Sequence, residues 1–388
     1  MKPNQVFLLL LVLVIPISCV EQSGPPQESV EAFKLGTFEV EGQHRLGIVL
    51  RDKSVVDLIS ANTALQNDAR FSKVAMPSDM LELIERYESG LKYRLYEIVN
   101  DLIHNNGLEG PGKSDFVYEA SDLRTLPPIM YPSKNMNAAV NFYTHACEGC
   151  SEEELAARTR ERQENRGVPY LFLKPTRGAI IGNGDDIVMP YGRDRIEWEV
   201  ELAIVFGTEG KYISASRAYD YVFGYMVAMD VSDRGGRPPG GYGSGSDWFV
   251  GKGHDTFAPQ GPWIVPKEFY GDPMEQLHQT LVIDGVTVQE ARAGDMIHNI
   301  PELIEYASSL ITIFPGDVLQ SGTSGGTGAG RVERATGSGY LQAGETIRAT
   351  IEGIGTLVHT VVAEEGVPGD LTGAELPPTA QYRGPAPR

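Results

Sequence analysis

Three carboxylates alternate with apolar residues in the stretch 196–206. Glu197, Glu199 and Glu201 come first, and the stretch then becomes wholly apolar, which is typical of a strand with one end in water and the other in a core. Alternate residues of a strand point to one face, about 6–7 Å apart. Neighbouring carboxylates repel one another unless a cation neutralises them, and ligation by oxygen alone favours Mg²⁺, Mn²⁺ or Ca²⁺ over zinc. The alternative is a strand face exposed to solvent.

A fourth carboxylate belongs to Asp230, which follows the apolar strand pattern of residues 221–228. An Asp at the end of such a strand is well placed to complete a metal site with Glu199 and Glu201. A side chain that caps a turn is the alternative. From these residues alone, a metal site formed by Glu199, Glu201 and Asp230 and a turn cap at Asp230 both remain open.

Two further features supply acid–base chemistry and positive charge. His145 and Glu148 are three residues apart, so on a helix they share a face and the carboxylate can orient the imidazole and raise its basicity. Such a pair can activate water, and a structural pair is the alternative. Lys252 is an isolated cation in an apolar setting, which suits an anionic substrate; a surface lysine is the simpler interpretation.

Two segments are rich in glycine. In residues 321–330 the glycines let backbone N–H groups approach an anion closely. The pattern G-x-G-x-x-G is not satisfied because Arg331 stands where glycine is needed, and no βαβ pattern surrounds it, which argues against a dinucleotide site. A glycine-rich turn is the alternative. Residues 235–248 form a long loop of the kind that often closes over a site.

Cys147 and Cys150 form a single C-x-x-C pair. A structural zinc site would need a second pair, which the sequence lacks. A disulfide in an oxidising compartment and two packed thiols both remain open.

The pattern of elements predicts an α+β fold. Strand and helix patterns alternate in a small N-terminal domain at 31–120, and a β-rich, roll-like domain follows at 126–363. Within the second domain we expect helices at 151–165, opened by a capping box of Ser151 and Glu154, and at 300–310. The Pro- and Gly-rich tail, 366–388, is expected to lack regular structure.

Charge and composition limit the possible partners. The chain has 388 residues and a net charge of −19. Such a surface, with no cluster of Lys or Arg to offset it, disfavours nucleic acid and anionic lipid. We expect a soluble body that acts on a small-molecule anionic substrate.

The N-terminus has the pattern of an export signal. Lys2 precedes a short apolar run at 6–17, which is typical of a signal-peptide core. Ser18 and Cys19 then resemble a bacterial lipoprotein signal. We predict a signal peptide at 1–19, a possible lipid anchor at Cys19, a tether at 20–30, and an exported protein that is periplasmic or membrane-anchored.

Five motifs, in one order along residues 126–363, resemble the fumarylacetoacetate hydrolase family. The family's Glu-x-Glu strand is similar to Glu199-Val200-Glu201, and its Asn-Asp-Val-Ser-x-Arg motif to residues 229–234. The other three, Gly-Lys-x-x-Asp, Pro-Gly-Asp…Thr-Gly-Thr-Pro and Asn-Tyr-x-x-His-x-x-Glu, are similar to residues 251–255, 315–324 and 142–148. The sequence departs from the family at Met229, Gly235 and Ser324, and Arg237 stands where a Gln can contact substrate.

The resemblance implies a β-roll catalytic domain, usually in a homodimer, with Mg²⁺, Mn²⁺ or Ca²⁺ held by Glu199, Glu201 and Asp230. It implies a catalytic role for His145, Glu148 and Lys252. The residues expected to bind substrate are Tyr143, Arg234, Arg237 and Thr323.

The implied reaction is metal-dependent hydrolysis of a C–C bond in an acylpyruvate or 1,3-dicarbonyl 2-oxo acid, through a metal-stabilised enolate. Hydration, decarboxylation and tautomerisation of a 2-oxo acid use the same enolate and remain alternatives. An exported, non-catalytic lipoprotein that binds a metal or ligand is an alternative from another class. It would not need the base and the lysine. A sugar-binding β-domain would need exposed aromatic residues along a groove.

Overall fold

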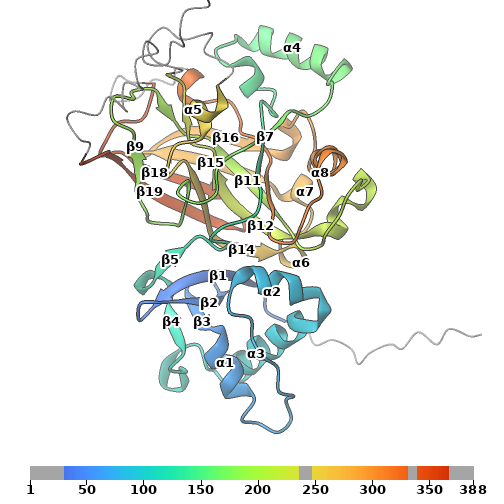
Figure 1. The fold of residues 1–388 in the computed structure, drawn as a ribbon, viewed down its shortest axis with the longest axis vertical. Helices are drawn as coiled ribbons and strands as arrows, with labels where there is room; N and C mark the ends of the chain where they lie inside the picture. Colours follow the sequence, from blue (N-terminus) through green and yellow to red (C-terminus); the bar gives the residue numbers. More distant parts are fainter. Residues whose placement is uncertain (1–29, 236–246, 331–338, 367–388) are drawn as a thin grey trace, which may run out of the picture.

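The computed structural model describes residues 30–235, 247–330 and 339–366. As predicted, the fold is α+β, with large sheets and few helices. Three helices and the first strands form one end of the molecule, and most of the remaining strands form the other (Figure 1). The predicted signal peptide with Cys19, and all but the last residue of the tether, lie outside the described residues, as do Arg237 and all but the first residue of the tail.

The N-terminal strands form a meander against three helices. Its strands are β1 (Phe33–Val40), β2 (Gln43–Leu50), β3 (Ser54–Asp57), β4 (Val117–Glu119) and β5 (Arg124–Leu126). Its helices are α1 (Leu58–Leu65), α2 (Met80–Arg86) and α3 (Lys92–His104). The side chain of Asp57 caps α1, and α3 buries Leu95, Ile98 and Leu102, which recur at the spacing of an amphipathic helix.

One twelve-stranded sheet connects the two ends of the molecule. Its main path runs β4-β3-β2-β1-β14-β12-β11-β17-β6-β7, while β5 pairs with β1 and β8 pairs with β14. The strands not yet defined are β6 (Asn135–Ala138), β7 (Leu171–Leu173), β8 (Ile180–Ile181), β11 (Val200–Phe206), β12 (Val222–Met229), β14 (Ala258–Pro266) and β17 (Val318–Gln320). Because β1 pairs directly with β14, the N-terminal strands extend the sheet that carries the predicted metal ligands.

A second sheet covers one face of the first. Its order is β16-β15-β18-β19-β9, and β10 pairs separately with β13. These strands are β9 (Ile187–Met189), β10 (Ile196–Glu197), β13 (Ser232–Asp233), β15 (His278–Ile283), β16 (Val286–Arg292), β18 (Thr346–Ile351) and β19 (Gly355–Ala363).

Strand β11 is buried on both faces. Leu202 and Ile204 pack with the second sheet, whereas Ala203 and Val205 pack with the N-terminal helices. This two-sided burial explains why the stretch becomes wholly apolar after Glu201.

Both helices expected in the second half are present. α4 (Glu152–Glu164) begins with the predicted capping box of Ser151 and Glu154, has no buried residue, and lies at the end of the molecule opposite α1–α3 (Figure 1). α8 (Ile300–Leu310) buries its apolar face. Three short helices are α5 (Trp248–Lys252), α6 (Lys267–Tyr270) and α7 (Pro273–Gln276).

Short 3₁₀-helical segments and one π-helical segment, η1, connect many of these elements. They are η1 (Tyr87–Leu91), η2 (Gly110–Gly112), η3 (Ala120–Asp122), η4 (His145–Cys147), η5 (Ala215–Tyr221), η6 (Ala293–Asp295) and η7 (Gly328–Gly330). Across the described ranges, no helix has both the length and the apolar composition needed to cross a bilayer.

Candidate metal centre

Three buried carboxylates converge where two neighbouring strands meet. Glu199 directly precedes β11, Glu201 is the second residue of that strand, and Asp230 directly follows β12. The antiparallel register places Val200 opposite Met229, and the backbone N–H of Asp230 donates to the carbonyl of Glu199 at 2.9 Å. One oxygen of each carboxylate lies within 4.8 Å of the others. The structure thus brings together the three residues predicted as metal ligands.

The electrostatics of the three carboxylates suit a hard cation. Glu199, Glu201 and Asp230 are 3%, 1% and 1% exposed. Burial raises the pKa of Glu201 well above its usual value, and the charges of Asp230 and Glu199 raise it further. Among the described residues no Lys or Arg forms an ion pair with Glu201. Three oxygen donors with this excess of negative charge fit Mg²⁺, Mn²⁺ or Ca²⁺.

Lys252, from α5, contacts two of the three carboxylates. Its Nζ lies 3.0 Å from Glu199 Oε2 and 2.5 Å from Asp230 Oδ2. The same ammonium is 5.2 Å from the ring centroid of Phe172 and 6.0 Å from that of Trp248. The apolar setting expected for this lysine is therefore present, and its partners are the carboxylates of the site.

A second buried lysine escaped the sequence analysis. Lys174 follows β7 directly and donates to Asp230 Oδ1 and, at 2.8 Å, to the carbonyl of Val231. Burial lowers the pKa of Lys174, and the charge of Asp230 opposes this shift. The available signal was a single charged residue between an apolar strand and Pro175, which local pattern alone does not connect to a strand more than fifty residues away.

Arg234 lies against the carboxylates on one side of the site. Its guanidinium pairs with both Glu197 and Glu199. Burial raises the pKa of Glu197 to about 7, although the charge of Arg234 opposes this. Burial also raises the pKa of Glu199, but the charges of Lys252, Arg234 and His145 outweigh it and lower that pKa overall. Arg234, predicted to bind substrate, is thus bound to site carboxylates, and its side chain remains 31% exposed.

The glycine-rich segment 321–330 surrounds the site with backbone donors. Its N–H groups donate to three different carboxylates of the chain: Gly322 to Glu201 at 2.7 Å, Thr327 to Glu148 at 3.3 Å, and Ala329 to Glu197 at 2.6 Å. Glycines permit this close approach. The anions that this segment contacts are therefore the carboxylates of the site.

His145 and Glu148 form the expected hydrogen bond. Nδ1 of His145 lies 3.0 Å from Glu148 Oε1, on the turn η4 rather than on a longer helix. Thr327 Oγ1 donates to the same carboxylate at 3.0 Å. Glu148 is thus fixed on two sides, and the glycine-rich segment that holds it also donates to Glu197 and Glu201. Within the described part of the chain the His145 ring bonds to Glu148 through Nδ1, which leaves Nε2 for proton transfer.

The other residues predicted to bind substrate do not share one environment. Tyr143 is half-buried and borders a cavity of about 410 Å³ under α4, which none of the metal ligands lines. Thr323 is buried; its hydroxyl donates to the carbonyl of Val200 and accepts from Gln289 Nε2, both at 2.9 Å. Arg237 lies outside the described residues. Substrate binding by these residues stays a prediction.

Gly330 offers a test of how Glu148 is held. A Cβ at this position would lie 2.0 Å from Glu148 Oε2. Because the clash is with the end of a flexible side chain, we expect Gly330→Ala to fold and to displace the carboxylate from His145. Turnover should fall about tenfold or more, since misplacement by about 1 Å can cost 10²-fold. Gly294→Ala, where a Cβ meets no atom within 4 Å, is the matched control; equal activity of the two variants would contradict this arrangement.

Comparison with known proteins agrees with the family resemblance found in the sequence motifs. The family model for the fumarylacetoacetate (FAA) hydrolase C-terminal domain matches residues 135–362. An uncharacterised protein of Pyrococcus abyssi is 38% identical over 236 residues, covering 61% of this chain and 93% of the relative. The mitochondrial oxaloacetate tautomerase FAHD2A of Bos taurus is 30% identical over 290 residues, covering 74% and 81%. The structure of maleylpyruvate hydrolase from Sphingobium sp. SYK-6, in complex with manganese(II) and pyruvate, has a TM-score of 0.61 and 26% identity, covering 86% of this chain and all of the other.

These relatives correct one prediction. Export as a periplasmic or membrane-anchored lipoprotein is wrong by this comparison, because relatives whose names state a location, such as the bovine tautomerase, are mitochondrial. The apolar run at 6–17 matched the composition of a signal peptide, but composition alone does not determine destination. The match to the family model, which spans more than half of the chain, confirms the family resemblance. The chain belongs to the fumarylacetoacetate hydrolase family and is one of its enzymes.

Proposed function

We propose that this enzyme is a metal-dependent hydrolase that cleaves a C–C bond in an acylpyruvate or another 1,3-dicarbonyl 2-oxo acid. The observation that carries the proposal is that one glycine-rich segment joins a His–Glu pair to three converging buried carboxylates, by donating to Glu148 and to Glu201. The pyruvate and manganese bound by the Sphingobium hydrolase support a substrate of the 2-oxo acid class.

Glu199, Glu201 and Asp230 would hold the divalent cation. Bound there, Mg²⁺, Mn²⁺ or Ca²⁺ would polarise the 2-oxo acid and stabilise negative charge on the enolate. Lys252, already paired with two of these carboxylates, lies where it can neutralise charge that develops on an anionic substrate.

His145 would serve as the general base. With Nδ1–H directed to Glu148, Nε2 is available to take a proton from water, and Glu148 stabilises the resulting imidazolium. Hydroxide would then attack the carbonyl remote from the carboxylate, and the C–C bond would break with the electron pair moving into the enolate. The imidazolium can return the proton to the leaving carbon.

Oxaloacetate tautomerisation is the second candidate. The bovine tautomerase supports it because the match covers 81% of that enzyme. This reaction also needs a base and a stabilised enolate, but no attack by water. A panel of acylpyruvates and 2-oxo diacids that includes oxaloacetate, assayed with Mg²⁺ or Mn²⁺, separates the two. Cleavage products support hydrolysis, whereas keto–enol exchange without cleavage supports tautomerisation.

Replacement of the base tests the assignment of the dyad. We expect His145→Ala to lower kcat about 10²–10⁴-fold, the usual contribution of a general base, while the affinity for Mn²⁺ measured by calorimetry stays unchanged. Glu148→Gln should fall between this variant and the wild type. Undiminished turnover by His145→Ala would refute the role of His145.

Removal of metal or of one ligand tests the metal centre. EDTA should abolish turnover, and added Mg²⁺ or Mn²⁺ should restore it. Asp230→Asn should weaken metal binding more than about 100-fold, because the loss of even a supporting residue typically costs 10–100-fold. Glu197→Gln is the control, because Glu197 pairs with Arg234 instead of joining the three carboxylates. Equal metal affinity of both variants would contradict the proposed ligand set.

The proposal also covers the residues that form the catalytic domain and the oligomeric state. We assign catalysis to residues 126–363 and infer a homodimer. Exposed apolar side chains at Tyr170, Leu173 and Phe249, which are 56%, 62% and 82% exposed, support a self-association surface close to Lys174 and Lys252. Light scattering of the purified chain would show a monomer if this inference is wrong.

A further inference from the structure

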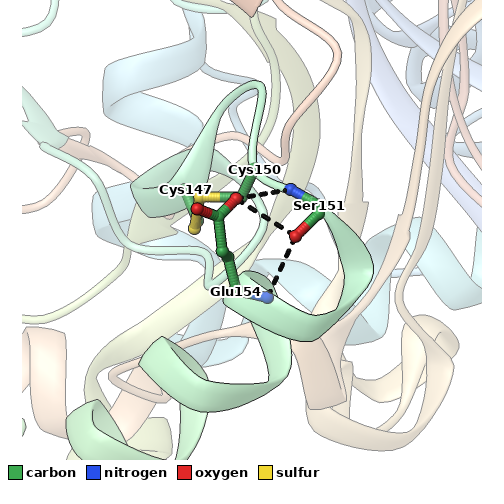
Figure 2. The surroundings of a disulfide bond; sticks show 4 residues. All are labelled: Cys147, Cys150, Ser151 and Glu154. Carbon is green, nitrogen blue, oxygen red and sulfur yellow. Dashed lines mark hydrogen bonds between the residues drawn. A yellow bond between two sulfur atoms is a disulfide. The ribbon is translucent and has the colours of Figure 1, made fainter.

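A disulfide encloses one member of the proposed catalytic dyad. Cys147 and Cys150 are bonded, with their Cα atoms 5.5 Å apart, and the residues between them are Glu148 and Gly149. Figure 2 shows the bond next to the first turn of α4. Of the two alternatives open from the sequence, the structure shows the disulfide.

Glu148 occupies a closely fitted position within this small loop. Besides its bond to His145, its carboxylate accepts hydrogen bonds from the backbone N–H groups of Gly326 and Thr327, at 3.4 and 3.3 Å. Gly330 lies so close that no side chain fits there without moving Glu148. These two backbone contacts are long for hydrogen bonds, so the backbone of the loop is needed to help hold the carboxylate in place.

The same disulfide holds the start of α4. Cys150 is followed by Ser151, whose side chain caps the helix together with Glu154 (Figure 2). No residue of α4 is fully buried, so packing holds this helix only weakly. Beyond its other end, Arg166 pairs with Glu302 at 2.8 Å. The disulfide therefore joins η4, which carries His145, to the cap of a weakly packed helix.

We propose that the Cys147–Cys150 pair is a redox-responsive positioning element for the His145–Glu148 dyad. The disulfide form holds Glu148 against His145 and keeps α4 attached. In the dithiol form the loop gains conformational freedom, the dyad loses its alignment, and turnover falls. This inference rests on the proposed catalytic role of the dyad.

The reductant is a dithiol, which reduces the cysteine pair by thiol–disulfide exchange. A thiolate of the reductant attacks Sγ of Cys150, which is more exposed than the buried Cys147, and Cys147 leaves as a thiolate that takes up a proton. The second thiol of the reductant then closes its own disulfide and releases Cys150. Two electrons and two protons pass from the reductant to the cysteine pair.

The experiment uses the full chain with Cys19→Ser, so that only the pair can react. Mass shifts with a maleimide should count no free thiol in the oxidised protein and two after treatment with a dithiol, which is removed before assay. We expect reduction to lower kcat about 10- to 100-fold, in line with the cost of a 1 Å misplacement, with unchanged affinity for Mn²⁺ and recovery on reoxidation. The variant Cys147→Ser/Cys150→Ser should have the low kcat with or without reductant.

Two controls distinguish positioning of the dyad from general support of the fold. In the Glu148→Gln background, reduction should no longer change kcat, because the group that the disulfide positions is already lost. Hydrogen exchange, which needs no substrate, should become faster at residues 143–164 on reduction and stay constant in β11 and β12.

The outcomes distinguish a failure of this proposal from a failure of the proposed function. Equal kcat and equal exchange in the two redox states would overturn the proposal, as would a Glu148→Gln enzyme that responds to reduction as strongly as the wild type. If no member of the substrate panel is turned over in either state, the proposed function fails, and the exchange at residues 143–164 still decides whether the disulfide orders the dyad.

Discussion

The structure depends on holding a group of carboxylates, which repel one another, in its buried core. Glu197, Glu199, Glu201 and Asp230 are all buried, and an unpaired buried charge costs several kcal/mol. Lys174, Lys252 and Arg234 surround these carboxylates and offset most of the cost. Glu201 has no such partner among the described residues, so the cluster retains an excess of negative charge. A divalent cation is the group that would complete the balance.

The need to hold these buried carboxylates together constrains the strands and segments that carry them. β11 and β12 must pair in one register for Glu199 and Asp230 to meet, and burial on both faces keeps this pair rigid. The three cations come from different segments: Lys174 directly follows β7, Lys252 ends α5, and Arg234 directly follows β13. The glycine-rich segment supplies N–H groups where a further side chain would not fit, as the close approach of Gly330 to Glu148 shows.

The proposed catalytic dyad and the proposed redox element share one short segment. Between Phe142 and Ser151 the chain carries the proposed base, the residue that would orient it, and both cysteines. Glu148 links this segment to the glycine-rich turn and thereby to Glu197 and Glu201. A change at the disulfide would therefore reach the proposed base directly, whereas the predicted metal ligands lie on or beside separate strands, β11 and β12.

The sequence by itself determined the features that local geometry controls. The two-residue period of a strand places Glu199 and Glu201 on one face, and the spacing of His145 and Glu148 brings them into contact. The pattern of strands and helices predicted the α+β fold, and the order of five motifs indicated the family. These predictions needed no knowledge of distant contacts.

The tertiary structure decided what depends on strand register and on partners distant in the chain. It paired Lys174 with Asp230, bound Arg234 to Glu197 and Glu199, and used the hydroxyl of Thr323 inside the core. It also selected the disulfide over packed thiols. Local pattern could not supply these results, because the partner of a buried charge is set by which strands lie side by side, and that is fixed only when the whole core packs.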